Sequence, residues 1–187
     1  MKKYLRGMIC ILYTLIRFCT IKLIKFNNFQ FSPINIISPF TQIEIGRKGK
    51  LSFGKKVKIR SGSKIRVRKK ATMKIGNNTS LNHNCIFTAH KGITIGENVQ
   101  FGPNVLIYDH DHDFRIKNGL KELKYKVDEV TIGNNVWIGA NVVILRGTKI
   151  ADNCVIGAGC VIKGYFEENT IITQERKYRK SKIVLEA

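Results

Sequence analysis

An aliphatic residue recurs at every sixth position through the last third of the chain, and this period constrains the fold more than any other feature. Six successive isoleucines share the spacing: Ile132, Ile138, Ile144, Ile150, Ile156 and Ile162. Four positions after each of the first five stands a small or β-branched residue: Val136, Val142, Thr148, Cys154 and Cys160. Asn and Gly, which tolerate left-handed backbone conformations, recur between them. Each hexad therefore predicts one short strand and one corner.

The same register appears earlier in the chain with less regularity. It is clear at Ile95, Phe101 and Ile107, and weaker at Ile75, Leu81, Phe87, Ile45, Leu51 and Val57. Antiparallel strands of a sandwich would alternate with period two and turn at irregular spacing. Three hexads per triangular coil, with aliphatic residues stacked inward, is the pattern of a parallel β-helix. We therefore predict an all-β fold, a left-handed parallel β-helix over residues 41–175.

One long insertion, roughly residues 108 to 130, interrupts the hexads between Ile107 and Ile132. It opens with YDHDHDF at 108–114, which places two of the four histidines between three aspartates. Loops held by a rigid scaffold often carry functional residues. The insertion is therefore predicted to be a protruding loop with a role in chemistry.

Residues 1–40 are predicted to form a basic amphipathic helix and a linker. The longest uncharged run, Gly7 to Ile16, is ten residues, short of the ~20 needed to span a bilayer, and no small-residue cleavage site follows it. On a helix, one arc collects the cations Lys2, Lys3, Arg6, Arg17 and Lys25, opposite the apolar residues Leu5, Ile9, Leu12, Ile16 and Leu23. This pattern favours a helix lying in an anionic membrane surface. The alternative is a helix packed on the protein's own core or on a neighbouring subunit.

The charge balance predicts anionic partners. The chain has 33 Lys+Arg against 13 Asp+Glu, a formal charge of +20, and residues 176–187 form a basic C-terminal tail. Nucleic acid is disfavoured because single-strand binders pair cations with exposed aromatics, whereas Phe87 and Phe101 occupy inward positions. Five cysteines without a CxxC pair fit reduced thiols and a cytoplasmic location, at the inner face of the cell membrane if the helix binds there.

Two segments carry a family resemblance: ITIGENVQFGPNVLIYDHDH at 93–112 and VTIGNNVWIGANVVILRGTKIADNCVIGAGCVIKG at 130–164. They resemble the hexapeptide-repeat O-acetyltransferases, nearest to the maltose and galactoside enzymes and the bacterial capsule and exopolysaccharide enzymes. The resemblance covers about residues 41 to 175. It implies acetyl-CoA-dependent transfer of acetyl to a sugar hydroxyl of a cell-surface polysaccharide or its precursor. It also implies a homotrimer with active sites between adjacent subunits, and no metal.

The resemblance carries site residues over to this sequence. The family's catalytic histidine lies nine residues beyond the proline of its PNV motif, and counting from Pro103 reaches His112, with His110 as the second candidate. Asn82 matches the asparagine that helps position the acceptor or the imidazole. Acceptor contacts are expected at Asn84, His90, Asp109 and Asp111. Acetyl-CoA contacts are expected at Trp137, Gly139, Ala140, Gly157, Ala158, Lys163, Arg176 and Lys177.

The chemistry agrees with these assignments. An imidazole with a pKa near 6.5 suits the removal of a hydroxyl proton and its return to the departing thiolate. Exposed backbone N–H groups at about Gly139 and Ala140 are expected to hold the oxyanion. Either Asp111 or Asp113 is expected to orient His112, unless the aspartates only form hydrogen bonds within the loop.

Two other function classes stay open. Left-handed β-helices of the carbonic anhydrase type hold zinc with three histidines, and this chain has histidines at 83, 90, 110 and 112. A non-catalytic anion-binding scaffold would also explain the positive charge.

Overall fold

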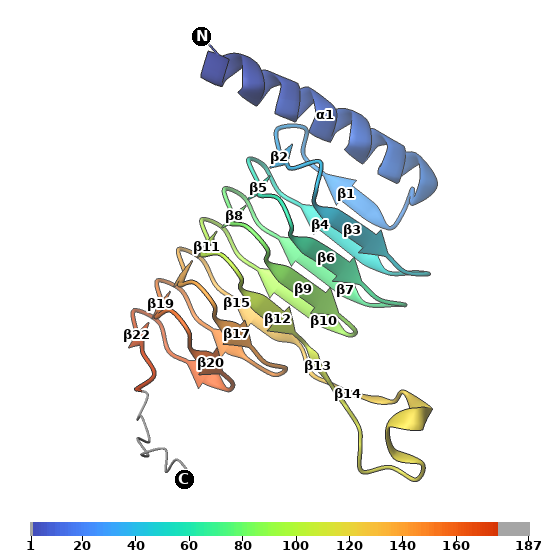
Figure 1. Ribbon diagram of the computed structural model, residues 1–187, viewed down its shortest axis with the longest axis vertical. Helices are drawn as coiled ribbons and strands as arrows, with labels where there is room; N and C mark the ends of the chain where they lie inside the picture. The colour runs from blue at the N-terminus through green and yellow to red at the C-terminus, as the bar shows by residue number, and fades with distance from the viewer. Residues whose placement is uncertain (1, 176–187) are drawn as a thin grey trace, which may run out of the picture.

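The structure is a computed structural model that describes residues 2–175 of the chain, and the side chains of residues 7–175. The helix α1 (Lys2–Ile24) lies across one end of a stack of triangular coils (Figure 1). Three parallel sheets form the sides of the stack, and successive strands of the chain pass from one sheet to the next. This is the left-handed parallel β-helix that the hexads predicted.

The strands of each sheet follow one another along the stack. The first sheet contains β1 (Phe29–Phe31), β4 (Lys50–Phe53), β7 (Thr72–Ile75), β10 (Gly92–Ile95), β15 (Val130–Ile132), β18 (Lys149–Ile150) and β21 (Tyr165–Phe166). The second contains β2 (Ile36–Ile37), β5 (Lys58–Ile59), β8 (Ser80–Leu81), β11 (Gln100–Phe101), β16 (Trp137–Ile138), β19 (Val155–Ile156) and β22 (Ile171–Ile172). The third contains β3 (Gln42–Ile45), β6 (Lys64–Val67), β9 (Ile86–Ala89), β12 (Leu106–Tyr108), β17 (Val143–Ile144) and β20 (Val161–Ile162).

The aliphatic residues of the hexads fill the interior of the stack. In the first sheet Ile75, Ile95, Ile132 and Ile150 are partners in adjacent strands, and all four are buried. Burying such a side chain contributes about 1.5–3 kcal/mol relative to exposure. The small position is also buried, and Cys154 lies there as a core side chain, as predicted.

The solenoid begins earlier than residue 41, because β1 pairs with β4 from Phe29 onward. The predicted register of the earliest coils was wrong. Phe53, rather than Leu51, pairs with Ile75. Leu51 and Phe53 of β4 are both buried, because a four-residue strand presents two inward positions. The hexad period alone does not choose between these two positions.

Asparagines make the corners between the first and second sheets. Five of them have φ between 55° and 59°: Asn78, Asn98, Asn135, Asn153 and Asn169. Their side-chain amides are hydrogen-bonded from coil to coil, as where Asn78 Nδ2 donates to Asn98 Oδ1 at 3.1 Å. Lys56 takes this corner in an earlier coil, with φ of 57°, and the ladder stops before it.

Helix α1 covers the first coil through one narrow face. The buried ring of Phe18 lies against Phe29, Phe31 and Phe53, with centroids 5.1, 5.2 and 5.2 Å away. The Thr14 hydroxyl accepts the backbone N–H of Ile37 at 2.9 Å. The helix therefore caps the open end of the core, so packing on the protein's own core is part of its role.

The cations of α1 with described side chains turn toward the coils rather than away from them. Arg17 donates to the carbonyl of Thr41 at 2.6 Å, and Lys22 donates to the carbonyl of Phe29 at 2.8 Å. Over residues 7–24 the outward face is uncharged and consists of Met8, Ile9, Leu12, Tyr13, Ile16, Cys19, Thr20, Leu23 and Ile24. Residues Gly7–Ile24 have a mean hydropathy of 1.8. By length and composition the segment is sufficient to cross a membrane, which the ten-residue run had not predicted.

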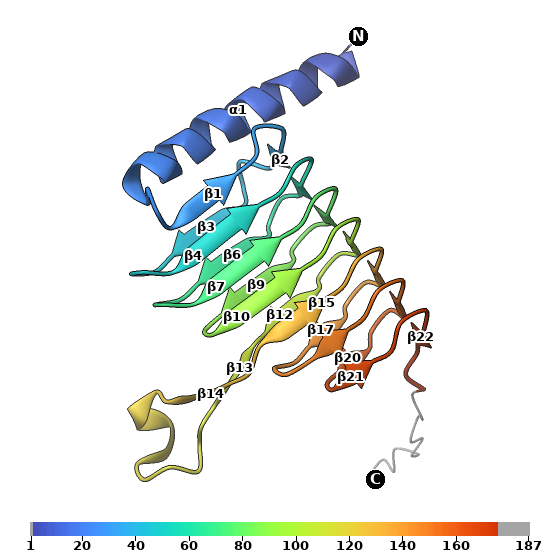
Figure 2. The ribbon, with the colours of Figure 1, turned by 180° about the vertical axis from the view of Figure 1, so that it is seen from behind.

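The predicted insertion leaves the stack after β12 and returns at β15. Strands β13 (His110–His112) and β14 (Tyr125–Val127) form an antiparallel pair at its base, and a 3₁₀ turn, η1 (Gly119–Glu122), lies near its tip. The loop extends away from the coils in both views of the molecule (Figures 1 and 2).

Candidate active site

Three histidines and a tyrosine gather at the base of the loop. The rings of His90 and His110 have centroids 3.9 Å apart, and Tyr125 lies 4.3 Å from His90 and 4.7 Å from His112. His90 comes from the turn after β9, whereas the other three residues belong to β13 and β14. The fold thus joins two predicted catalytic residues with one predicted acceptor contact.

Asp109 fastens this cluster to the stack. Its carboxylate is fully buried and accepts the backbone N–H groups of His90, Lys91 and Gly92, the shortest contact of each at 2.7 Å. It also bonds Nδ1 of His110 at 3.2 Å. Burial opposes its ionisation, but these hydrogen bonds lower the pKa of Asp109 below its usual value. Asp109 was predicted to touch the acceptor. Because both its oxygens are bonded within the protein, it holds the loop instead.

The cluster favours a neutral His90. Burial lowers the pKa of His90 to about 4, with the neighbouring His110 adding to the effect. Near neutral pH this ring is therefore an uncharged packing surface for His110 and Tyr125, not a cation for an acidic acceptor.

His112 has the most accessible imidazole of the loop. It is exposed at the end of β13, and among the described residues neither ring nitrogen has a hydrogen-bond partner. Asp111 and Asp113, one of which was expected to orient it, instead pair with Arg146 and Lys126. Within the described chain, the orientation of His112 is therefore set by its ring contact with Tyr125 and by the pairing of β13 with β14.

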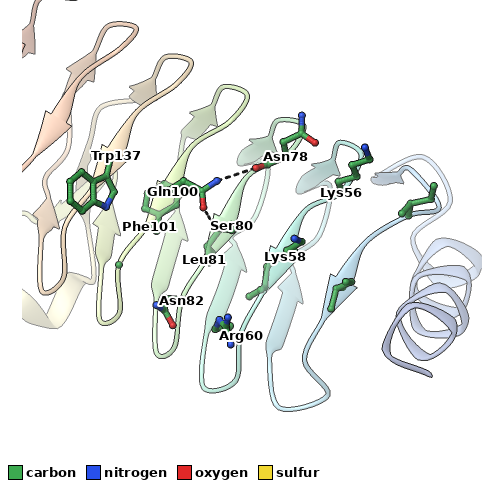
Figure 3. A pocket seen from close by; sticks show the side chains of 14 residues that line it. Lys56, Lys58, Arg60, Asn78, Ser80, Leu81, Asn82, Gln100, Phe101 and Trp137 are labelled. Carbon is green, nitrogen blue, oxygen red and sulfur yellow. Dashed lines mark hydrogen bonds between the residues drawn. The ribbon is translucent and has the colours of Figure 1, made fainter. Parts of the chain in front are cut away.

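Asn82 lies at a different corner, between the second and third sheets. Its Oδ1 accepts the backbone N–H of His83 at 2.9 Å, while Nδ2 has no partner among residues 7–175 and faces a groove (Figure 3). His112 belongs to the corner between the third and first sheets. One chain therefore does not bring these two predicted catalytic residues together.

The groove beside Asn82 runs along the outside of the second sheet and encloses about 810 Å³. We call it the second-sheet groove. Its floor is an outward column of register partners, Lys58, Ser80, Gln100 and Trp137. Figure 3 shows Trp137 at one end, Asn82 and Gln100 between, and Lys56, Lys58 and Arg60 toward the end nearest α1.

In later coils the position of Asn82 is occupied by glycines, Gly102, Gly139 and Gly157, which we call the glycine track. Gly102 follows Asn82 in the stack, and Gly139 follows Gly102, since each N–H bonds the next coil. A Cβ on Gly102 or Gly139 would lie 2.6 Å from the backbone nitrogen of Ala140 or Ala158. Glycine is required at both because the corners stack this closely.

Four of the residues predicted to contact acetyl-CoA, Gly139, Ala140, Gly157 and Ala158, lie along this track, and one detail of the prediction is corrected. Gly157 continues the column, and Trp137, 60% exposed, stands beside it. The N–H of Gly139 was expected to hold an oxyanion, but it donates to the carbonyl of Ile156 at 2.8 Å. The N–H of Ala140 has no acceptor among the described residues, so it is the better donor.

The remaining predicted residues are scattered. Asn84 is exposed at a left-handed corner with φ of 60°, two residues from Asn82. Lys163 is exposed beyond β20. Arg176 and Lys177 lie outside the described residues.

A zinc centre of three histidines does not form within the part of the chain that the structure describes. In residues 7–175, no three His, Cys, Asp or Glu side chains are grouped to hold a metal. His83 stands apart, bonded through Nδ1 to the Ser61 hydroxyl at 2.8 Å.

Several residues of the site escaped prediction from the sequence. Tyr125 lies 13 residues beyond His112 in an irregular loop, with no motif around it. Lys58, Arg60 and Gln100 sit at outward hexad positions, where any polar residue is compatible with the repeat. The strand register joins Lys58 and Gln100 to Ser80 and Trp137, and the bond from the Arg60 N–H to the Leu81 carbonyl places Arg60 in the column of Asn82. These pairings mark the residues as one surface.

The chain is similar to known acetyltransferases. Residues 129–164 match the family model described as bacterial transferase hexapeptide (six repeats). "Putative acetyltransferase YJL218W" of Saccharomyces cerevisiae is 41% identical over 97 residues, 52% of this chain and 49% of that protein. Galactoside O-acetyltransferase of Escherichia coli is 38% identical over 105 residues, 54% of this chain and 49% of that protein.

"Putative lipopolysaccharide biosynthesis O-acetyl transferase WbbJ" of Escherichia coli is 32% identical over 104 residues, 51% of this chain and 53% of that protein. Among solved structures, a galactoside acetyltransferase in complex with coenzyme A is 29% identical, with a TM-score of 0.50, over 70% of this chain and 60% of that one. The predicted resemblance to hexapeptide-repeat O-acetyltransferases is confirmed. The chain spans about half the length of the curated relatives it matches.

Proposed function

We propose that the protein is an acetyl-CoA-dependent O-acetyltransferase that acetylates a hydroxyl of a cell-surface polysaccharide or its precursor. The observation that carries this proposal is the second-sheet groove, in which Nδ2 of Asn82, without a partner among residues 7–175, lies where the glycine track and Trp137 begin. The named activities of the similar proteins, galactoside and lipopolysaccharide O-acetyl transfer, support a sugar hydroxyl as acceptor.

His112 is the proposed general base. It removes the proton of the acceptor hydroxyl as that oxygen attacks the thioester carbon. The carbon–sulfur bond then breaks, and the proton passes from the imidazole to the thiolate. The products are the acetate ester and free coenzyme A, and no covalent enzyme intermediate is needed. The N–H of Ala140 is available to the oxyanion of the tetrahedral intermediate.

His110 is proposed as a positioning residue. Its Nδ1 bonds buried Asp109 and its ring packs on His90, so it is less free than His112 to meet an acceptor. Replacing His112 with Ala should lower kcat at least about 100-fold, within the range for loss of a general base. Replacing His110 with Ala should lower kcat by a smaller factor. Free thiol released from acetyl-CoA in the presence of maltose, galactosides or lipid-linked glycan precursors measures both, and the opposite order would transfer the role of base to His110.

We further propose active sites between adjacent subunits of a homotrimer, because Asn82 and His112 lie on different corners of one chain. A second copy of the chain would bring its loop to the groove of the first. Mixing of two inactive variants tests this directly. Refolded mixtures of Asn82→Ala and His112→Ala should recover activity, because some interfaces then combine an intact Asn82 with an intact His112. If each chain holds a complete site, mixing restores nothing.

We also propose that α1 lies in the plane of an anionic membrane surface, from which a cytoplasmic enzyme would reach a membrane-linked acceptor. Over residues 7–24 the outward face of α1 is uncharged, with Leu23 82% exposed, and no acidic residue precedes Glu44 in the sequence. A spanning orientation would pull Phe18 out of its aromatic cluster and Arg17 off its carbonyl. An in-plane helix keeps both contacts.

Vesicle flotation tests this location. The intact protein should float with vesicles that contain phosphatidylglycerol, and less with phosphatidylcholine alone. Leu12→Gln with Ile16→Gln should abolish flotation, while Val161→Gln with Ile171→Gln, equally apolar and exposed at the other end, should not. If the α1 variant floats normally but changes the oligomeric state in light scattering, this face contacts a second copy instead.

A further inference from the structure

Three cations occupy the end of the second-sheet groove nearest α1, and none has a carboxylate partner among residues 7–175. They are Lys56, Lys58 and Arg60, all exposed, and no acidic residue lines the groove. On the third sheet, by contrast, Arg66 and Arg68 both pair with Glu44. The groove therefore holds a local charge of three with nothing in the described chain to neutralise it.

Their positions relative to Asn82 follow from the strand register. Arg60 is in the same column as Asn82, one coil nearer α1, since its N–H bonds the carbonyl of Leu81. Lys58 is the register partner of Ser80. Adjacent parallel strands lie about 4.8 Å apart. An anionic group roughly 5–10 Å from the hydroxyl held at Asn82 would reach Arg60 and Lys58.

The two ends of the groove differ in chemistry. Toward the C-terminal coils the groove continues as Trp137 and the glycine track, where acetyl-CoA is proposed to lie. Toward α1 the floor is cationic. Between them, Ser80 and Gln100 are hydrogen-bonded to each other, and Gln100 Nε2 donates to the carbonyl of Asn78 at 3.3 Å. This polar floor suits sugar hydroxyls.

We infer that the acceptor is an anionic glycan whose phosphate or carboxylate binds Arg60 and Lys58, with Lys56 as a third cation, while its reacting hydroxyl lies at Asn82. The inference rests on the proposed acetyl transfer and names its substrate class. Arginine suits such a group because its planar fork makes paired, charge-assisted hydrogen bonds to both phosphate and carboxylate oxygens. Unpaired lysines add attraction that weakens with salt.

The test separates this subsite from the transferase activity itself. Acetylation is measured by thiol release with three acceptors: N-acetylglucosamine, its 1-phosphate, and glucuronic acid. The variant is Lys58→Gln with Arg60→Gln. The matched control is Lys50→Gln with Lys74→Gln, two exposed lysines on the outer face of the first sheet that also remove two charges.

The groove variant should raise the KM for the anionic acceptors about tenfold or more, and leave the KM of the neutral sugar and of acetyl-CoA unchanged. The control should match the wild type. Preference for the phosphate or for the uronic acid identifies which anion the groove takes. A rise in the KM for acetyl-CoA instead would show that these cations bind coenzyme A phosphates. Equal losses with charged and neutral acceptors would also overturn the inference.

Failure of the proposed function looks different, because then no acceptor would release thiol from the wild type. Binding is therefore measured as well, by calorimetry with N-acetylglucosamine 1-phosphate alone. Weaker binding to the groove variant than to the control supports the anion subsite whether or not turnover occurs. Equal binding to both contradicts it.

Discussion

The buried carboxylate of Asp109 gives the sharpest quantitative prediction, because the structure shows every hydrogen bond it makes. Its Oδ2 accepts from Lys91 and Gly92 at 2.7 Å and from His90 at 3.0 Å. Its Oδ1 accepts from His90 at 2.7 Å and bonds His110 at 3.2 Å. Asp109→Asn keeps the shape but converts one acceptor oxygen into an NH₂ group. If the NH₂ group replaces Oδ2, the N–H groups of Lys91 and Gly92 lose their acceptor. If it replaces Oδ1, the N–H of His90 loses its 2.7 Å contact, and in both orientations the remaining bonds lose their charge assistance.

Each such loss costs about 1–3 kcal/mol, so the variant should be about 3 kcal/mol less stable near neutral pH. For a chain of this size 1 kcal/mol corresponds to about 2–4 °C in Tm, which predicts a fall of about 6–12 °C. Asp111→Asn is the matched control. It removes the neighbouring carboxylate, whose exposed pair with Arg146 contributes about 0–1 kcal/mol. Thermal unfolding is followed by circular dichroism at one fixed protein concentration.

The pH dependence supplies a second check. Because folding lowers the pKa of Asp109, the native protein binds fewer protons there than the unfolded chain. The stabilisation is fully present above the usual aspartate pKa of about 3.9, and it is lost as the pH falls through the lower folded value. The difference in unfolding free energy between the wild type and Asp109→Asn should therefore become smaller at acidic pH. If Asp109→Asn melts like Asp111→Asn near pH 7, Asp109 does not hold the loop, and its role in contacting an acceptor would have to be reconsidered.

Three further outcomes follow from the structure. Burial lowers the folded pKa of His90 to about 4, so on acidification the unfolded chain binds a proton at this residue before the folded chain does. The free energy of unfolding should therefore fall as the pH drops from about 6.5 to 4. His90→Gln should reduce this dependence, measured by unfolding at a series of pH values. Gly139→Ala places a Cβ 2.6 Å from the nitrogen of Ala158 and should cost about 1–3 kcal/mol of unfolding free energy, whereas Gly7→Ala, with nothing within 4 Å, should gain about 0.5–1 kcal/mol. Trp137→Ala should change stability by less than about 0.5 kcal/mol but raise the KM for acetyl-CoA about fivefold; an unchanged KM would remove Trp137 from the donor site.

The later coils could be predicted from sequence because their strands are two residues long and offer one inward position each. From Ile138 to Ile162 each aliphatic residue has no competitor for the core within its strand, so the period of six determines the register. Near the N-terminus β3 and β4 have four residues, and both Leu51 and Phe53 of β4 are buried. The period then fits two registers equally well, and the structure takes the one that was not predicted.

The N-terminal helix shows a different limit of sequence prediction. The helical periodicity of its apolar residues correctly placed Ile9, Leu12, Ile16 and Leu23 on one face. Periodicity alone does not say which face of the helix packs against the protein. Phe18 decides this, because only that ring enters the aromatic cluster of the first coil. The apolar face that a soluble helix would bury is consequently the one left outside.

The loop residues were identified from the position of the insertion, but their individual roles depend on contacts between distant segments. Asp109 and His112 are three residues apart in the chain. One is sealed by the turn at His90 and the other is exposed. Sequence spacing does not distinguish a buried residue from an exposed one here. Burial had to be observed before Asp109 could be given a structural role and the exposed His112 proposed as the base.

The second-sheet groove was beyond sequence analysis for a geometric reason. Its floor residues Lys58, Ser80, Gln100 and Trp137 are separated by 22, 20 and 37 residues, so no fixed period connects them. The first two intervals differ because the coils differ in length, and the third contains the loop. Once the register is known, the same four residues lie on adjacent strands about 4.8 Å apart. The order of side chains along this line, from cation to sugar-sized polar floor to tryptophan, fixes the direction in which an acceptor and a donor would meet at Asn82. A substrate that carries its charge on the wrong side of the reacting hydroxyl should therefore be a poor acceptor even if its composition is the same.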